Sequence, residues 1–184
     1  MKKWFRQSVF YKWWSLFLTR FGDIMMATEP PKVKACHLRE LMKVIQRGDV
    51  ICRKYTYYLD SHFIKGAYSH SGFCLSSEEM IHAIAEGVGK IDVLDFTKDS
   101  DGFIILRPTY KSEDHLRRAC AFALEQDGKP YDFLFDKKEK SAFYCHELTY
   151  NILNIAEIVI LPKDKVIYAD DIISRCTIIY ETKT

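Results

Sequence analysis

Several features that would assign a protein to a class are scarce or missing in this sequence. Its 184 residues include only 8 glycines and 5 prolines, and they contain no internal repeat, no low-complexity tract and no glycine-rich phosphate loop. Nucleotide-binding folds that depend on such a loop are therefore excluded. The net charge is only +2, which argues against binding to nucleic acid. No apolar run approaches the roughly 18 residues that a membrane-spanning helix requires.

The six cysteines are scattered, without a CxxC pair or a closely spaced series. Disulfide-rich domains are short and dense in cysteine, so we expect free thiols in a reducing, cytoplasmic compartment. A zinc site built from His70, His82 and Cys145 has no obvious fourth ligand and no closely spaced ligand pair. We therefore expect neither a metal nor another cofactor.

The composition that remains is that of a folded protein. Hydrophobic residues make up 48% of the chain and charged residues 28%, which is typical of a globular domain. A chain of this length forms one domain with a substantial core and a short appendage. We expect an amphipathic helix in residues 1–28, a linker in residues 29–36 and the folded domain in residues 37–184.

The N-terminal segment carries a helical stripe of apolar residues beside basic ones. Residues 1–28 hold five cations and one anion, a net charge of +4, which leaves −2 for the remainder. A basic, aromatic amphipathic helix fits the surface of a membrane, whereas a wide apolar stripe equally fits burial against the domain or a second subunit. Lys12, Ser15 and Arg20 interrupt the apolar residues, which is not typical of a signal peptide. The stripe comprises Phe10, Trp13, Trp14, Phe17, Leu18, Phe21, Ile24 and Met25.

A further helix is predicted to begin near Cys145, because Leu148, Thr149 and Ile152 follow at helical spacing. The N-terminus of a helix carries unsatisfied N–H groups and a partial positive charge, so we expect the pKa of the Cys145 thiol to be lowered. A cysteine in this position is either a nucleophile or a small packed residue. A base elsewhere in the chain would decide between the two.

Two histidines lie in segments that alternate like neighbouring strands. His70 belongs to residues 67–75 and His82 to residues 80–85, with a turn-forming segment between them. A turn at residues 75–77 would place His70 directly opposite His82, whereas a turn longer by one residue would send the two rings to opposite faces. We expect the first arrangement, in which His70 is a base and His82 orients its ring.

Periodicity and turn residues predict the other elements. Helices are expected over residues 37–47 and between Ser112 and Gly128, and strands over residues 48–52, 102–107 and 176–180. Gly87-Val-Gly89 is expected to form a turn, followed by a strand or loop over residues 90–96.

Five motifs in order resemble a known family. They are Gly48-Asp-Val-Ile51, Tyr68-Ser-His-Ser-Gly72, Ile81-His-Ala-Ile-Ala-Glu-Gly-Val88, Gly128-Lys-Pro-Tyr-Asp-Phe-Leu-Phe135 and Tyr144-Cys-His-Glu-Leu148. Over residues 47–174 the chain resembles the circularly permuted NlpC-like cysteine hydrolases of the YiiX type. The resemblance implies an α+β, permuted papain-like fold in which an antiparallel sheet packs against the helix that bears the nucleophile.

The same resemblance implies roles for individual residues. Cys145 would be the nucleophile, His70 the general base and His82 the third member of the triad. The Cys-His-His set is similar to that of the related lecithin:retinol acyltransferase branch. We expect substrate to be bordered by Tyr68, Tyr131, Tyr144 and His146.

The expected activity is hydrolysis of an amide or ester carbonyl through a thioester acyl-enzyme, as in a peptidase or amidase. Two alternatives stay open: a lipid acyl hydrolase or acyltransferase at a membrane surface, and an inactive interaction module. The substrate would be a peptide, an amide or a lipid acyl group, and residues 1–28 would supply any peripheral contact with a membrane. The sequence does not assign an oligomeric state.

Overall fold

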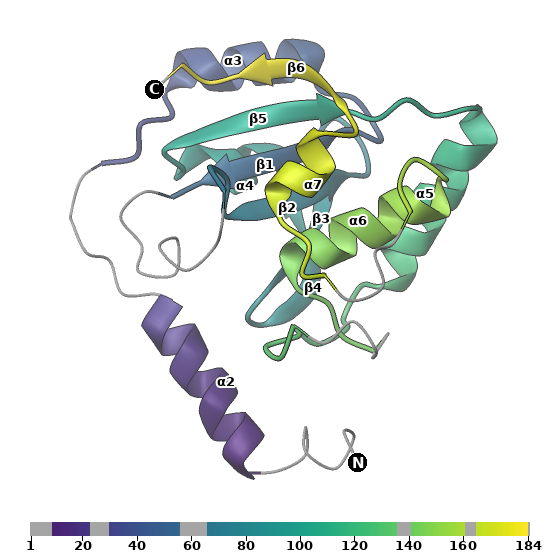
Figure 1. Cartoon of the computed structure of the whole chain (residues 1–184). Coiled ribbons are helices and arrows are strands. Elements are labelled where there is room, and N and C mark those ends of the chain that lie inside the picture. The colour runs from purple at the N-terminus through teal and green to yellow at the C-terminus, as the bar shows by residue number, and fades with distance from the viewer. Residues whose placement is uncertain (1–8, 23–29, 56–65, 136–140, 161–164, 184) are drawn as a thin grey trace.

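An antiparallel sheet forms the centre of the domain in a computed structural model of the chain (Figure 1). The structure describes residues 9–22, 30–55, 66–135, 141–160 and 165–183. The strands are β1 Val50–Lys54, β2 His70–Cys74, β3 Glu79–Ile84, β4 Gly87–Asp92, β5 Gly102–Arg107 and β6 Thr177–Glu181. They lie in the order β4-β3-β2-β1-β5-β6, and each neighbouring pair is antiparallel.

Helices cover both faces of this sheet. They are α3 Ala35–Val44, α4 Val93–Lys98, α5 Glu113–Glu125, α6 Cys145–Ile155 and α7 Ala169–Ile173, and α2 Val9–Gly22 precedes them in the chain. One buried cluster joins the sheet to α3 and α4 through residues such as Ile51, Phe96 and Ile105. The other joins the opposite face to α5, α6 and α7. The α+β expectation is confirmed.

Strand β5, which lies between β1 and the edge strand β6, has the predicted bounds. Its apolar run is almost continuously buried, because both faces of the sheet are covered at this strand. Ile105 faces the cluster around α3 and α4, whereas Ile104 and Leu106 face the cluster around α5 and α6. Pro108 follows directly after the strand and cannot extend the ladder.

The hairpin of β2 and β3 differs from the expected register. Gly72 pairs with His82, and the Leu75 N–H donates to the Glu79 carbonyl at 2.9 Å, so the turn lies at residues 76–78. The prediction that His70 stands directly opposite His82 is therefore wrong. The turn has the expected length of three residues, but it begins at residue 76 rather than at residue 75. His70 and His82 are diagonal neighbours instead, and side chains two positions apart remain on the same face.

The segment after β3 also differs. Gly87 and Gly89 begin strand β4 rather than form a turn, and Gly89 pairs with His82. Asp92 then caps the short helix α4 by accepting hydrogen bonds from the Leu94 and Asp95 N–H groups at 2.7 and 3.2 Å. This helix was expected as a strand or loop, because six residues are too few to show a helical period.

The predicted helices are present with adjusted ends. The first of these helices was expected over residues 37–47. Helix α3 instead begins at Ala35 and ends at Val44, because Ile45 already has an extended backbone. Helix α5 begins directly after Ser112, and α6 begins at Cys145, both as expected. The start of α6 is the feature that positions the candidate nucleophile.

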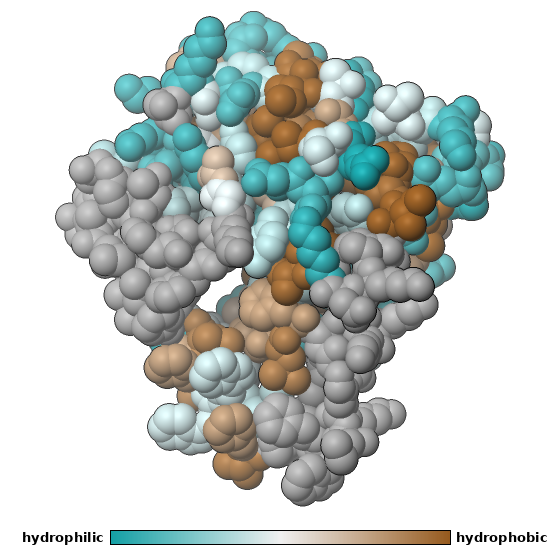
Figure 2. Space-filling model, in the orientation of Figure 1, coloured by the Kyte–Doolittle hydropathy of each residue, from teal (hydrophilic) through white to brown (hydrophobic). Residues whose placement is uncertain are grey.

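Helix α2 exposes a continuous apolar surface. Val9, Trp13 and Leu16 are 77%, 72% and 57% exposed, and Phe10 and Phe17 beside them are 64% and 48% exposed. We call these five residues the outer strip of α2. Figure 2 shows apolar side chains gathered at this end of the molecule. In the described part of the chain, no helix is long and apolar enough to cross a bilayer.

Candidate active site

Cys145 is the first residue of α6 and lies against the start of β2. Its side chain is 5% exposed, and the thiol donates a hydrogen bond to the Ser69 carbonyl oxygen, with Sγ and O 3.9 Å apart. The backbone N–H groups of Ser71, His146 and Cys145 also interact with the sulfur. The sulfur therefore adjoins the peptide groups on both sides of His70.

The Cys145 thiol is not activated by its position alone. Burial raises its pKa to about 11, against the opposing effect of the N–H groups around it and the nearby charge of Arg53. The expectation of a lowered pKa is wrong, because loss of solvent outweighs the partial charges at the start of the helix. At neutral pH the resting group is a thiol, so attack on a carbonyl requires a base.

The two histidines form a hydrogen-bonded pair. His70 Nε2 and His82 Nδ1 are 2.9 Å apart, and the ring centroids are 5.2 Å apart in an edge-to-face arrangement. His82 is 4% exposed and His70 is half-buried at the first residue of β2. Because Nε2 of His70 is engaged by His82, Nδ1 is the nitrogen left to act as a base.

Phe96 and Arg53 surround this pair, and sequence reasoning missed both. The Phe96 ring centroid lies 5.4 Å from each imidazole centroid. Arg53 pairs with His70 across β1 and β2, its guanidinium lies 4.2 Å from the Phe96 ring centroid, and it donates to the Phe96 carbonyl. The alternation of β1 could have indicated Arg53, whereas Phe96 lies on the helix that the sequence did not reveal.

Both imidazoles are neutral at physiological pH. Burial is the main cause that lowers the pKa of His70 well below its ordinary value, with further contributions from Arg53, His82 and His146. Burial and the Arg53 charge lower the pKa of His82 to about 4. A neutral imidazole is the form that can accept a proton, so the pair is ready to act as a base.

Gly72 leaves the space in which these rings meet. It lies on the same face as His70 and pairs with His82. A Cβ at this position would collide with the methyl group of Met80 and would lie 3.3 Å from a ring carbon of Phe96. A residue with a side chain would therefore push on the ring that contacts both histidines.

A second polar network lies on the opposite face of β2. His146 Nδ1 and Ser71 Oγ are 2.8 Å apart, Ser71 Oγ and Thr149 Oγ1 are 3.1 Å apart, and Thr149 donates to the Cys145 carbonyl at 3.2 Å. All three side chains are buried. Burial is the main cause that lowers the pKa of His146 to about 4. The network connects the first turn of α6 to the strand that carries His70.

The residues expected to border substrate are mostly occupied by internal contacts. His146 is 2% exposed, Tyr68 is 5% exposed and Tyr144 is 2% exposed. The Tyr68 hydroxyl donates to Glu181 at 2.7 Å, and the Tyr144 hydroxyl accepts from the Ile167 N–H at 2.7 Å. Tyr131 is partly exposed, with its ring centroid 4.9 Å from that of Phe133. Of the four, the structure leaves Tyr131 most open to a ligand.

The aromatic residues of segment 53–65 also predict a loop over the site, and positions 56–65 of that segment lie outside the described residues. All six cysteines are described, and all are free thiols. Among the described residues, no group of three or more His, Cys, Asp or Glu side chains is arranged to hold a metal ion.

Comparison with known proteins decides the family. Residues 44–174 match the model of the family described as permuted papain-like amidase enzyme, YaeF/YiiX, C92 family. The chain belongs to this family. The family is described as permuted papain-like, which is the fold expected from the sequence.

One solved structure similar to this family member is the metalloprotein yiiX from Escherichia coli O157:H7. The two sequences are 19% identical, with a TM-score of 0.45, and the match covers 60% of this chain and 66% of that chain. This chain therefore matches slightly less than two thirds of that protein. A search of the curated proteins gave no match.

Proposed function

We propose that this protein is a cysteine hydrolase that cleaves an amide bond, with Cys145 as nucleophile, His70 as general base and His82 as the residue that orients His70. The observation that carries the proposal is the 2.9 Å contact of the two imidazoles together with the position of the Cys145 sulfur against the backbone of Ser69 and Ser71, the residues on either side of His70. Membership in a family described as amidases supports the reaction class.

The tautomers follow from the contact between the rings. If His70 Nε2–H donates to His82 Nδ1, then His70 Nδ1 carries a lone pair and can accept the thiol proton. The Cys145 side chain turns from the Ser69 carbonyl toward this nitrogen as it reacts. His82 then stabilises the imidazolium through a hydrogen bond rather than through a full negative charge.

Acyl transfer then proceeds in two halves. Sulfur attacks the carbonyl carbon while its proton passes to His70, and His70 returns that proton to the leaving amine as the C–N bond breaks. Water attacks the resulting thioester with His70 as base, which releases the acid and restores the thiol. The backbone N–H of Cys145 is available as one oxyanion donor, because the first N–H groups of a helix have no partner within the helix.

Labelling with thiol-directed acyl probes tests this proposal. The labelled site is found by mass spectrometry in the unmodified chain and in Cys145→Ala, His70→Ala and Cys36→Ala variants. Cys36 is an exposed thiol on α3 and provides a matched control. We expect Cys145 to be labelled in the unmodified chain and in Cys36→Ala, and to lose labelling in His70→Ala. Labelling of Cys145 that does not depend on His70 would refute the base assignment.

A lipid acyl ester is a second candidate substrate. The outer strip of α2 favours it, because exposed aromatic residues would bring the enzyme to a lipid surface. Probes with a short peptide and with a long acyl tail distinguish the two substrates. Faster labelling of Cys145 by the acyl probe, in the absence of vesicles, would favour the lipid substrate over the amide.

A further inference from the structure

We infer that the outer strip of α2 docks onto a membrane surface that contains anionic lipid. This inference is independent of the catalytic proposal, since it concerns residues 9–22 and makes no use of Cys145. The segment has exposed apolar residues, hydroxyl groups that are hydrogen-bonded within the helix, and a net positive charge opposite in sign to that of the rest of the chain.

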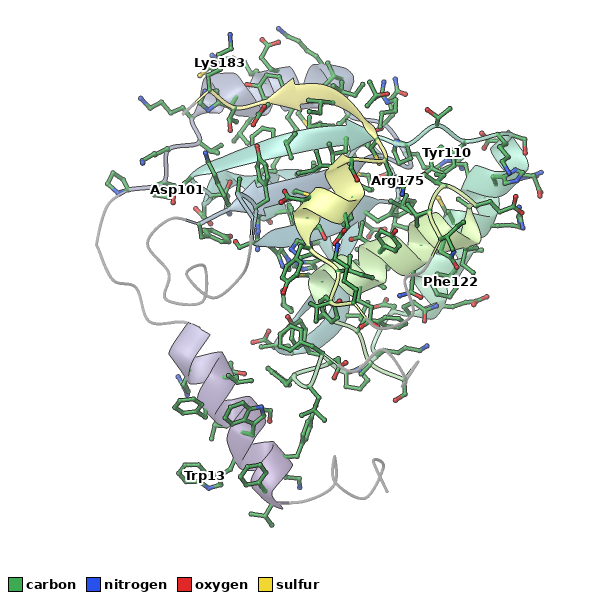
Figure 3. The ribbon with its side chains drawn as sticks, in the orientation of Figure 1. Trp13, Asp101, Tyr110, Phe122, Arg175 and Lys183 are labelled. Carbon is green, nitrogen blue, oxygen red and sulfur yellow. The ribbon has the colours of Figure 1, made fainter. Side chains whose placement is uncertain are left out.

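Three residues of the outer strip project into solvent along one line of α2. Val9, Trp13 and Leu16 follow one another at helical spacings of four and three residues, so they form one line along the helix. Each is more than half exposed. Figure 3 shows the Trp13 side chain projecting outward from α2. A line of this kind needs an apolar environment, and the described part of the domain does not supply one.

The polar side of the helix needs no partner. The Ser15 hydroxyl donates to the Lys12 carbonyl at 3.0 Å, and the Thr19 hydroxyl donates to the Ser15 carbonyl at 2.9 Å. Lys12 and Arg20 are exposed, and Arg20 continues the line of Val9, Trp13 and Leu16 toward the C-terminal end of the helix. Long basic side chains in this position extend from an apolar surface to the lipid headgroups.

Charge selects the membrane over a second copy of the chain. Residues 1–28 carry +4, whereas the remaining residues carry −2. Two such helices packed together would bring like charges into contact, whereas an anionic bilayer attracts them. The strip is also rich in aromatic residues, which favour the interface between water and lipid. Over its described residues, Val9–Gly22, the helix is too short and too polar to span the bilayer, and the proposed contact is with the membrane surface.

Tryptophan fluorescence reports on this segment alone. The three tryptophans of the chain are Trp4, Trp13 and Trp14. A shift of their emission to shorter wavelength on addition of vesicles therefore shows that this segment has entered an apolar environment. The domain contributes no tryptophan signal.

The experiment is flotation of the full chain with phosphatidylcholine vesicles, with and without phosphatidylserine, combined with tryptophan emission. We expect binding to the anionic vesicles that weakens with salt. The Val9→Gln/Leu16→Gln variant keeps all three tryptophans and good helix propensity, and it should lose about tenfold or more in affinity. The Lys12→Gln/Arg20→Gln variant should lose about fivefold for each cation.

A matched control is the Leu124→Gln/Ile178→Gln variant, which removes two exposed apolar residues from the domain. It should bind as the unmodified chain does. Absence of binding, equal binding to both kinds of vesicle, or no effect of Val9→Gln/Leu16→Gln would overturn the inference. So would a dimer in solution that this variant dissociates, because the outer strip would then be covered by a second copy.

Discussion

The two faces of strand β2 carry different chemistry. His70 and Gly72 point toward α4, where the rings of His82 and Phe96 lie. Ser71, between them, points toward α6 and is hydrogen-bonded to His146 and Thr149. The histidine pair is thus assembled by the register of the sheet, whereas the sulfur is placed by the packing of a helix on the opposite face. The two parts of the site should respond to different substitutions.

The largest expected effect is on the histidine face. His70→Gln removes the base and should lower the rate of Cys145 acylation on the order of 10³-fold. The free energy of unfolding should change little, since His70 is only half-buried at the end of the strand. Acylation kinetics and chemical denaturation measure the two quantities. An equal loss of rate in Ser71→Ala would show that the faces are not separable.

His82 should have a smaller effect and a diagnostic pH dependence. His82→Gln should lower the rate by about 10-fold to 10²-fold, because the ring of His70 loses its orienting partner. His82→Glu places a carboxylate beside His70, which raises the pKa of His70 from its lowered value. The acid limb of the pH–rate profile should therefore move to higher pH. A profile that does not move would argue against contact between the two residues during catalysis.

Gly72 tests the space between the rings. Gly72→Val should displace Phe96 and lower the acylation rate about tenfold, with about 1 to 3 kcal/mol of destabilisation from overpacking. Gly72→Ala should have a smaller effect, since its methyl group chiefly meets the flexible end of Met80. Equal rates in both variants and the unmodified chain would show that Phe96 does not constrain the histidines.

Ser71→Ala should act mainly on stability. It removes the partner of the buried His146 Nδ1 and leaves Thr149 with only its bond to the Cys145 carbonyl, which costs about 1 to 3 kcal/mol. The acylation rate should fall only a few-fold, because the histidine pair is untouched. Thr177→Ala, at an exposed position of β6, is a control for loss of a hydroxyl in the sheet. A rate loss as large as that of His70→Gln would contradict the assignment.

The last effect is on stability in acid and leaves the acylation chemistry aside. His146 has a pKa of about 4 when folded and near its ordinary value of 6.5 when unfolded. Between these values the unfolded state binds the proton and the folded state does not, so the chain is destabilised as the pH falls through this window. The slope for one such group is at most about 1.4 kcal/mol per pH unit. The melting temperature at pH 7 and pH 5 should differ less in His146→Gln than in the unmodified chain.

Most of the sheet and the start of α6 were predictable because their patterns are local. Strand β5 is an apolar run ended by proline, and α6 shows helical spacing from its first residue. The exact register, in which Gly72 rather than His70 stands opposite His82, was not predictable, since the turn at 76–78 has no glycine to fix its type. That the two histidines share a face was nevertheless predictable. Side chains two positions apart on a strand point to the same face, so a shift of the register by two residues leaves both rings on one side of the sheet.

The remaining features depend on tertiary structure. The raised pKa of Cys145 follows from burial, which outweighs a local effect that the sequence does show. Phe96 reaches the histidines from a six-residue helix that has no sequence period of its own. The contact of His146 with Ser71 joins residues 75 positions apart, and no spacing rule relates them.

The turn at residues 76–78 has a consequence for how this family member can change. Insertion or deletion of a single residue there would rotate β3 relative to β2 and move His82 to the other side of the hairpin. Surface turns tolerate changes of length at little cost to folding. A change of one residue in this hairpin loop, far from the sulfur along the chain, would therefore leave a protein that still folds but has lost the histidine pair.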